Sequence, residues 1–282
     1  MSEHLDYTLF YWPEILGRGE FVRLCFEASG VEYKEQNDVA ELSKLLSNKE
    51  VAGIAAPHFA VPVLGVRVVG DAASASKKAR VDTAADVKDG GKTHYISQTP
   101  VILSFLAPRL GLLGDAEKLE GLERDVAVAQ IQQLCATALD LNNETHDTHH
   151  PISVSSYYED QQEEAKKRAA DFRTNRLPKF LQVFEVALRD NGAGPDQKTQ
   201  GASRMWASRT TVADLTVFQV VDGLQFAFPR CMQKLKQGGK YNHVFQLHDQ
   251  IKQELKEYLE SDRRLPYSNG VFRHYPELDQ DE

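Results

Sequence analysis

The residues best suited to chemistry lie near the middle of the chain, where titratable side chains cluster. They are His146, Asp147, His149 and His150. Histidine exchanges protons near neutral pH, and histidines three or four residues apart on a helix can bind a metal ion. Pro151 interrupts such a helix, no cysteine is near in sequence, and His and Asp side chains also hold helix ends by hydrogen bonds. We therefore favour a structural role or the lining of a substrate pocket over a metal site, with Tyr157 and Tyr158 as further pocket candidates.

A second group of candidates depends on an α/β layer that the first part of the sequence predicts. Residues 7–12 (YTLFYW) are typical of a short strand, Glu20–Ser29 of a helix, and Val31–Glu35 of a second strand. A strand, a helix and a strand in this order form a unit whose strands are parallel. Further elements are expected at 40–46 (helix), 59–66 and 93–96 (strands) and 98–110 (helix).

Strand patterns nearly vanish after Lys118, and amphipathic segments follow. They cover 118–144, 157–190, 211–228 and 243–260. We expect a helical bundle here, with Thr211 and Asp214 forming a capping box at the start of one helix. The acidic tail after Leu265 is expected to wrap the surface or to fray.

Composition limits the class of protein. The 282 residues predict two domains, and 41% hydrophobic with 26% charged residues is typical of a globular chain. The net charge of -8 and the lack of a basic run argue against nucleic acid, and no apolar stretch approaches the ~18 residues of a membrane span. Three scattered cysteines and no leader-like start predict a cytoplasmic protein without structural zinc.

The first of three motifs gives a family resemblance. Residues 7–23 (YTLFYWPEILGRGEFVR) resemble the tyrosine-type classes of the cytosolic glutathione transferase superfamily, with a mu- or sigma-like N-terminal motif. Tyr11 and Trp12 match the family's Tyr-aromatic pair. The resemblance implies that both contact glutathione and that the Tyr11 phenol donates to its sulfur, which stabilises the reactive thiolate.

Two more motifs follow in the family's order. The segment with Val61 and Pro62 is similar to the thioredoxin-like x-V-P-x segment, whose Val-Pro bond is cis and whose valine offers its backbone to the cysteinyl part of glutathione. Gln98 and Thr99 resemble the Gln-Ser (or Glu-Ser) pair that the family has before its helix 3. There the helix start, aided by the Thr99 hydroxyl, suits the γ-glutamyl carboxylate.

The resemblance implies a thioredoxin-like α/β domain at 1–114, an all-helical domain at 115–282 and a homodimer. The implied activity is detoxifying glutathione transfer to an electrophilic small molecule, with no cofactor beyond the co-substrate glutathione and no metal. The alternatives are a glutathione-dependent isomerase or ether-cleaving enzyme, or a non-catalytic interaction module on the same fold.

The sequence departs from the family pattern at two places. Leu16 stands where an arginine often precedes the Gly-Arg-x-Glu segment, so Lys49, or Lys44, is the candidate for the glycyl carboxylate of glutathione. The polar stretch 67–94 reads as an insertion in a β-hairpin.

The cluster at His146, His149 and His150 falls where the family has its co-substrate pocket.

Overall fold

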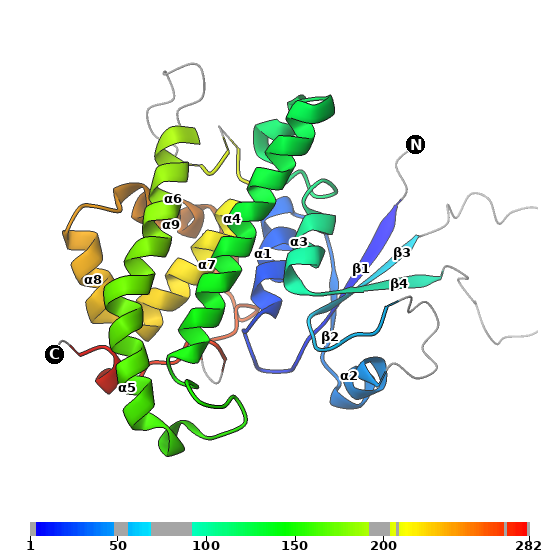
Figure 1. The fold of residues 1–282 in the computed structure, drawn as a ribbon. Helices are drawn as coiled ribbons and strands as arrows, with labels where there is room; N and C mark the ends of the chain where they lie inside the picture. Colours follow the sequence, from blue (N-terminus) through cyan, green and yellow to red (C-terminus); the bar gives the residue numbers. More distant parts are fainter. Residues whose placement is uncertain are drawn as a thin grey trace, which may run out of the picture. The chain divides into compact units, whose positions relative to one another are not determined.

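The computed structural model describes residues 4–47, 56–68, 92–191, 204–206, 209–267 and 270–280. The chain divides into two compact units (Figure 1). The first, called here the sheet unit, contains residues 1–13 and 31–102. The second, the helical unit, contains residues 14–30 and 103–282.

The sheet unit is built on four strands in the order β2-β1-β3-β4. They are β1 (Leu5–Phe10), β2 (Lys34–Gln36), β3 (Val63–Val68) and β4 (Thr93–Ser97). The strands β1 and β2 are parallel, whereas β3 is antiparallel to both β1 and β4. One helix, α2 (Val39–Leu46), follows β2; Asp38 accepts a hydrogen bond from the Glu41 N–H at 3.0 Å and so caps it.

Two strands differ from the sequence prediction. The second strand begins at Lys34 rather than Val31, and β3 begins at Val63 rather than Phe59. Pro62 therefore lies directly before β3, where its missing N–H costs the sheet no hydrogen bond. Of the predicted insertion at 67–94, residues 69–91 lie outside the described residues.

The helical unit contains the remaining elements. They are α1 (Gly19–Ser29), α4 (Gly121–Asp147), α5 (Gln162–Asp171), α6 (Leu177–Asn191), α7 (Val212–Ala227), α8 (Pro229–Gln237), α9 (Asn242–Glu254), α10 (Lys256–Leu259), a π-helical segment (Phe172–Arg176) and short 3-10 turns at Gly114–Lys118, Tyr158–Asp160 and Pro276–Leu278. Between the units in sequence runs α3 (Thr99–Leu106), shorter than the predicted 98–110.

The centre of the helical unit is α7, which is buried along most of its length and contacts α1, α4 and α9 (Figure 1). The helix begins with a capping box. The Thr211 hydroxyl accepts from the Asp214 N–H at 3.3 Å, and Asp214 Oδ2 accepts from the Thr211 N–H at 2.7 Å. Asp214 also accepts from the Met205 N–H at 2.7 Å. All three bonds are buried, so this pair fixes the start of α7.

The C-terminal segment packs into the helical unit, and the expectation that it wraps the surface or frays is wrong for residues 270–280. Phe272 is 5% exposed and lies on Gly223 of α7, where a Cβ atom would overlap its ring. Asp279 accepts from the N–H groups of Arg230 and Cys231 at 2.7 and 3.1 Å and caps α8. The tail is a structural element because it supplies a ring to the core and a cap to a helix.

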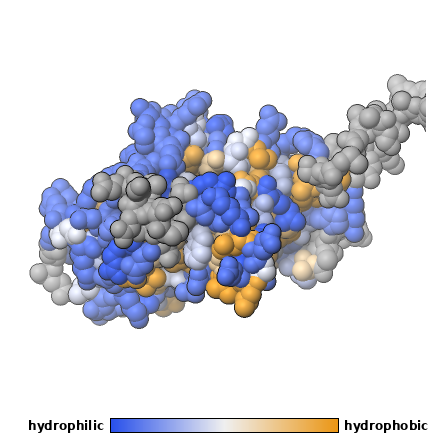
Figure 2. All heavy atoms as spheres, turned by 90° about the horizontal axis from the view of Figure 1, so that it is seen from above, coloured by the Kyte–Doolittle hydropathy of each residue, from blue (hydrophilic) through white to orange (hydrophobic). Residues whose placement is uncertain are grey.

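The surface is mixed, and Figure 2 shows patches of hydrophobic residues among hydrophilic ones on one face. Large apolar side chains with high exposure include Phe59 (91%) in the sheet unit, and Leu122 (77%) and Val126 (45%) on α4. Among the helices of the described residues, none has the length and apolar character needed to cross a membrane.

Candidate functional site

Most of the predicted glutathione-binding residues meet at one end of the sheet. The last paired row across it joins Gln36 to Phe10, Phe10 to Val63, and Val63 to Ser97. Tyr11 directly follows β1, Pro62 directly precedes β3, and Gln98 directly follows β4. Neighbouring strands lie about 4.8 Å apart, so these three residues share one edge of the sheet. We call this edge, with Trp12, Val61 and Thr99, the sheet-end site.

Tyr11 is held firmly in place. Its N–H donates to the Gln36 carbonyl at 3.3 Å, which extends the pairing of β1 with β2 by one residue. Its side chain is 6% exposed, whereas Trp12 is half-buried. A buried phenol at a strand end has few rotamers open to it, which suits a donor that must meet one ligand atom.

The Val61–Pro62 peptide bond is cis. Within the described residues, neither the N–H nor the C=O of Val61 bonds to another backbone group, although its side chain is only 8% exposed. A backbone donor and acceptor next to a strand end can pair with an extended peptide-like ligand in the manner of one more strand.

The start of α3 contains a second set of ligand-ready groups. Gln98 has a φ of 71°, the left-handed region that costs a residue with a side chain about 1 kcal/mol. Its carbonyl accepts the Ile102 N–H at 2.9 Å, so Gln98 forms the cap of the helix. Thr99 is 1% exposed, and its hydroxyl has no hydrogen-bond partner among the described residues. A helix start with a buried unpaired hydroxyl can receive an anionic group.

His58 is a residue of this region that the sequence did not indicate. Its Nδ1 lies 3.0 Å from the Ser97 hydroxyl, and its ring packs edge-on to Tyr95 at 6.3 Å. Burial lowers the pKa of this imidazole. His58 therefore fixes Ser97, the residue before Gln98, and no motif would have identified it because His58 and Ser97 lie far apart in sequence.

Two lysines are the candidates for binding the glycyl carboxylate of glutathione. Lys49 lies outside the described residues, and Lys44 is exposed on the last turn of α2. Leu16 is 3% exposed, and its carbonyl accepts from the Arg23 guanidinium at 3.2 Å. The position where the family often has an arginine is thus occupied by a core residue.

The helical unit has a cavity of about 470 Å³ that includes part of the histidine cluster. Its lining residues are His146, His150, Val154, Ser155, Ser156, Tyr157, Tyr158, Glu159, Arg273 and Tyr275. Four of the five predicted pocket candidates are among them, and the fifth, His149, contacts both lining histidines. The size is typical of small-molecule sites. We call it the histidine cavity.

The three imidazoles contact one another. The centroid of His146 lies 5.0 Å from that of His149 and 4.9 Å from that of His150, on which it stacks. His149 is 2% exposed; its Nε2 lies 2.8 Å from the Val271 carbonyl and so carries the proton, while its Nδ1 has no hydrogen-bond partner among the described residues. Burial lowers the pKa of His149 to about 3, and also lowers those of His146 and His150. The cluster is uncharged at neutral pH.

Two features of the cavity were not apparent from the sequence. Gln161 holds the loop around it, because its side chain accepts from the Ile152 N–H at 2.9 Å and donates to the Ser153 carbonyl at 2.9 Å. The C-terminal segment supplies Arg273 and Tyr275, and Tyr275 stacks on Tyr158 at 3.8 Å. Within the described residues, no group of three or more metal-binding side chains could hold a metal ion.

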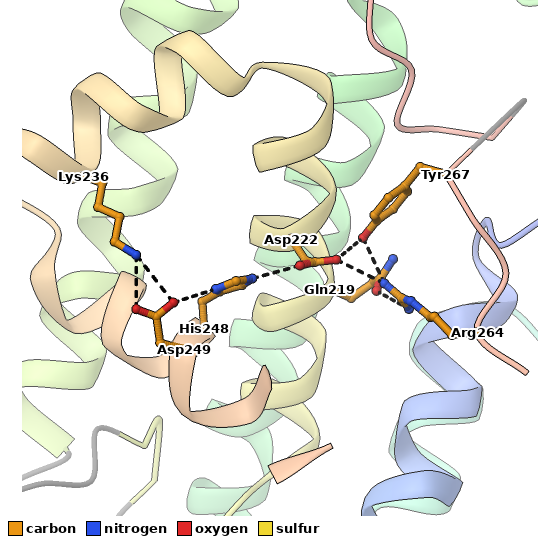
Figure 3. A network of polar contacts seen from close by, with 7 residues as sticks. All are labelled: Gln219, Asp222, Lys236, His248, Asp249, Arg264 and Tyr267. Carbon is orange, nitrogen blue, oxygen red and sulfur yellow. Dashed lines mark hydrogen bonds and ion pairs between the residues drawn. The ribbon is translucent and has the colours of Figure 1, made fainter. Parts of the chain in front are cut away.

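Figure 3 shows a second polar cluster of the helical unit, in which Gln219 and His248 are buried whereas Lys236 and Asp249 are exposed. Arg264 pairs with Glu20 of α1 and donates to Asp222 at 3.2 Å and to Gln219 at 3.0 Å, both on α7. The Tyr267 hydroxyl donates to Asp222 at 2.7 Å.

This cluster continues on the other side of Asp222. Its Oδ1 lies 2.9 Å from His248 Nε2, His248 Nδ1 lies 3.2 Å from Asp249, and Asp249 accepts from Lys236 at 3.1 Å (Figure 3). We call the whole chain of contacts, from Glu20 to Lys236, the Arg264 network. It joins the C-terminal segment to α1, α7, α8 and α9.

Comparisons with known proteins agree with this architecture. Residues 146–262 match the family model for the glutathione S-transferase C-terminal domain. No curated protein matches the sequence. Among solved structures the chain is similar to a Fasciola hepatica sigma class GST, with a TM-score of 0.60 and 16% identity over 94% of this chain and 98% of that one.

Two further structures show the same relationship. An Onchocerca volvulus Pi-class glutathione S-transferase gives a TM-score of 0.58 and 20% identity over 90% of this chain and 92% of that one. The structure of rat hPGDS complexed with a quinoline gives a TM-score of 0.57 and 16% identity over 93% of this chain and 98% of that one. Residues 146–262 thus match a glutathione S-transferase C-terminal domain, and the chain as a whole has the fold of the glutathione transferases in these structures.

Proposed function

We propose that the protein binds glutathione at the sheet-end site and transfers it to an electrophilic small molecule. One observation carries the proposal: a phenol, a backbone segment with no backbone partner in the described part of the chain, and a helix start whose buried hydroxyl has no partner there either share one edge of the sheet. They belong to Tyr11, Val61 and Thr99. These groups correspond to three chemical parts of glutathione, namely its thiol, its peptide-like middle and its γ-glutamyl carboxylate.

The mechanism consists of thiol activation and positioning. A free thiol has a pKa near ~8.5, so at neutral pH most of it is protonated, whereas the thiolate is the nucleophile. The Tyr11 hydroxyl donates a hydrogen bond to the sulfur and favours the thiolate; the released proton goes to solvent. The sulfur then forms a bond to an electrophilic carbon, and the leaving group departs with its electron pair.

The remaining contacts hold the tripeptide. Val61 and Pro62 place a backbone N–H and C=O against the cysteinyl residue, Gln98 and Thr99 receive the γ-glutamyl carboxylate, and Trp12 packs beside Tyr11. Lys49 remains our candidate for the glycyl carboxylate, with Lys44 as its alternative. No metal or cofactor besides glutathione enters this scheme, because glutathione brings its own nucleophile.

The histidine cavity is our candidate for the co-substrate pocket. His146, His150 and Tyr157 line it, and the His149 ring packs against the rings of both lining histidines. Detoxification, and action in the cytoplasm, would follow from such an activity. The location also suits the three cysteines, none of which forms a disulfide.

A glutathione-dependent isomerase or ether-cleaving enzyme is the second candidate. The polar lining of the histidine cavity favours it, because hydroxyls and imidazoles suit a specific oxygen-bearing metabolite better than a broad set of apolar electrophiles. Stoichiometry separates the candidates: an isomerase regenerates glutathione with each turnover, whereas a transferase consumes it.

We also propose that the protein forms a homodimer. The support is the exposure of large apolar side chains in each unit, namely Phe59, Leu122 and Val126. A dimer mass by light scattering, reduced to that of a monomer by Phe59→Ser, would agree with this. A native protein of monomer mass at micromolar concentration would contradict it.

Calorimetric titration with glutathione tests the binding proposal. Thr99→Val removes the unpaired hydroxyl with little change of shape and should weaken binding about tenfold, as expected for one hydrogen bond to a charged group. Thr99→Ser should retain most of the affinity, and Thr137→Val on α4 is the matched control. If the native protein does not bind glutathione at millimolar concentration, the interaction-module alternative replaces the enzyme.

A further inference from the structure

The lining of the histidine cavity includes exposed aromatic and apolar surface. Tyr157 and Val154, both lining residues, are 78% and 70% exposed. The loop that contains them is held by Gln161, whose side chain donates to the Ser153 carbonyl at 2.9 Å. An aromatic ring on a fixed loop, open to a cavity, favours a flat ligand, because aromatic rings pack well in offset stacks.

His146 is the polar group of the lining that is best placed to bind a ligand. Its side chain is 25% exposed. The described residues give it two ring contacts, with His149 and His150, and an approach of 3.9 Å to Asp147, which is too long for a hydrogen bond. Within the described part of the chain, both nitrogens of this imidazole are therefore without a hydrogen-bond partner.

The surroundings of His146 keep its ring neutral. Burial is the largest cause of its lowered pKa, and the neighbouring His150 adds to it. The positive charges of Arg273 and Arg18 lower the pKa further, whereas Asp147 raises it. A neutral imidazole has one N–H donor and one proton-free acceptor. The ring is therefore complementary to a group that can both donate and accept a hydrogen bond.

We propose that the histidine cavity binds a co-substrate with a hydroxylated aromatic ring, which lies against Tyr157 and whose hydroxyl pairs with His146. A hydroxyl can pair with an imidazole in either tautomer, whereas a carboxylate requires the N–H and an ammonium requires the proton-free nitrogen.

The inference rests on the proposed function, because it names the class of molecule to which glutathione is transferred. The hydroxyl is the group by which the molecule is bound, and the electrophilic carbon is a separate part of it. The proposal narrows the general expectation of an apolar electrophile to an aromatic molecule with one polar group that is uncharged at neutral pH.

Calorimetry with matched probes tests this without glutathione. The probes are 3-nitrophenol and 3-nitroanisole, which share the aromatic ring and differ in the hydroxyl proton that the ether lacks. At pH 7, where the phenol is mainly uncharged, we expect the native protein to bind it about fivefold more tightly than the ether, as for one hydrogen bond between neutral groups. A third probe, 3-nitrobenzoate, should bind more weakly than the phenol.

Four variants assign the contacts. His146→Phe retains a flat ring and removes both nitrogens, so the phenol should bind no more tightly than the ether, whose affinity should not change. His146→Gln again offers a donor and an acceptor and should retain most of the preference for the phenol. Tyr157→Ala should weaken binding of both probes by about fivefold, because both lose the ring contact. His94→Phe, which replaces an exposed histidine of β4, should alter neither affinity.

Four results would each overturn the proposal. They are equal affinity of the native protein for phenol and ether, tighter binding of the benzoate than of the phenol, no detectable binding of the phenol at millimolar concentration, and an unchanged preference for the phenol in His146→Phe. Failure of glutathione to bind in its own titration would overturn the proposed function instead.

Discussion

The Arg264 network and the histidine cavity lie in the same helical unit, and both draw on the C-terminal segment. In the network the buried polar atoms have partners: Arg264 is paired with Glu20 and Asp222, and His248 has a carboxylate at each ring nitrogen. In the histidine cluster the buried Nδ1 of His149 has no hydrogen-bond partner among the residues that the structure describes, and a cavity opens beside the cluster.

The comparison separates polar groups that build the fold from those that can bind a ligand. A buried charge is tolerated when it is paired, and a fully paired cluster has no donor or acceptor left for a ligand. An unpaired buried polar atom beside a cavity or a helix start has that capacity. The Thr99 hydroxyl at the sheet-end site belongs with His149 in the second group.

The largest expected effect is loss of the network's central charge. Arg264→Met leaves Glu20 and Asp222 buried without their cation and should lower the free energy of unfolding by about 3–5 kcal/mol. Urea unfolding measures it. The control is Arg263→Gln, which removes a largely exposed guanidinium paired with Glu27 and should change stability by less than about 1 kcal/mol. Equal effects would abolish the distinction between the two clusters.

A smaller loss should follow from moving the segment that supplies both clusters. Gly223→Ala places a Cβ atom where the Phe272 ring lies, and overpacking of this kind costs about 1–3 kcal/mol. Urea unfolding measures this loss, and unchanged stability would show that the Phe272 contact does not position the segment.

The neutral state of the histidine cluster predicts an acid-sensitive stability. His149 has a pKa of about 3 in the folded protein and an ordinary value of 6.5. Because the folded pKa is the lower one, its contribution is complete above pH 6.5 and is lost as the pH falls toward 3. Between pH 6.5 and 4.5 this amounts to roughly 2 kcal/mol.

Unfolding free energies of the native protein and of His149→Gln, measured across that range, test this. The native protein should lose more stability than the variant between pH 6.5 and 4.5. If the unfolding free energies of the two proteins changed with pH in parallel, the pKa of His149 would not be lowered in the folded protein.

The motifs that could be predicted from the sequence are local. The Tyr11–Trp12 strand end, the Val61–Pro62 segment, the start of α3 and the Thr211–Asp214 capping box are each written in a few adjacent residues whose backbone conformation determines their role. Such segments are recognisable because a strand end, a proline bend or a cap restricts which residue types can occupy it.

The features that could not be predicted depend on packing between distant segments. Arg273 and Tyr275 reach the histidine cavity only because Phe272 fits on Gly223, and nothing in the tail's composition indicates that fit. Likewise α8 has only Met232 buried and is capped by Asp279 from the tail, a contact that the residues of α8 itself do not indicate.

The most direct test of the central claim is the ultraviolet difference spectrum of bound glutathione, recorded against pH for the native protein and for Tyr11→Phe. The account predicts thiolate absorbance in the native complex well below the ~8.5 of a free thiol, and a return toward that value in the variant with glutathione still bound. A native complex whose thiolate appears only near ~8.5, or a Tyr11→Phe variant with the native titration, would contradict thiol activation by Tyr11.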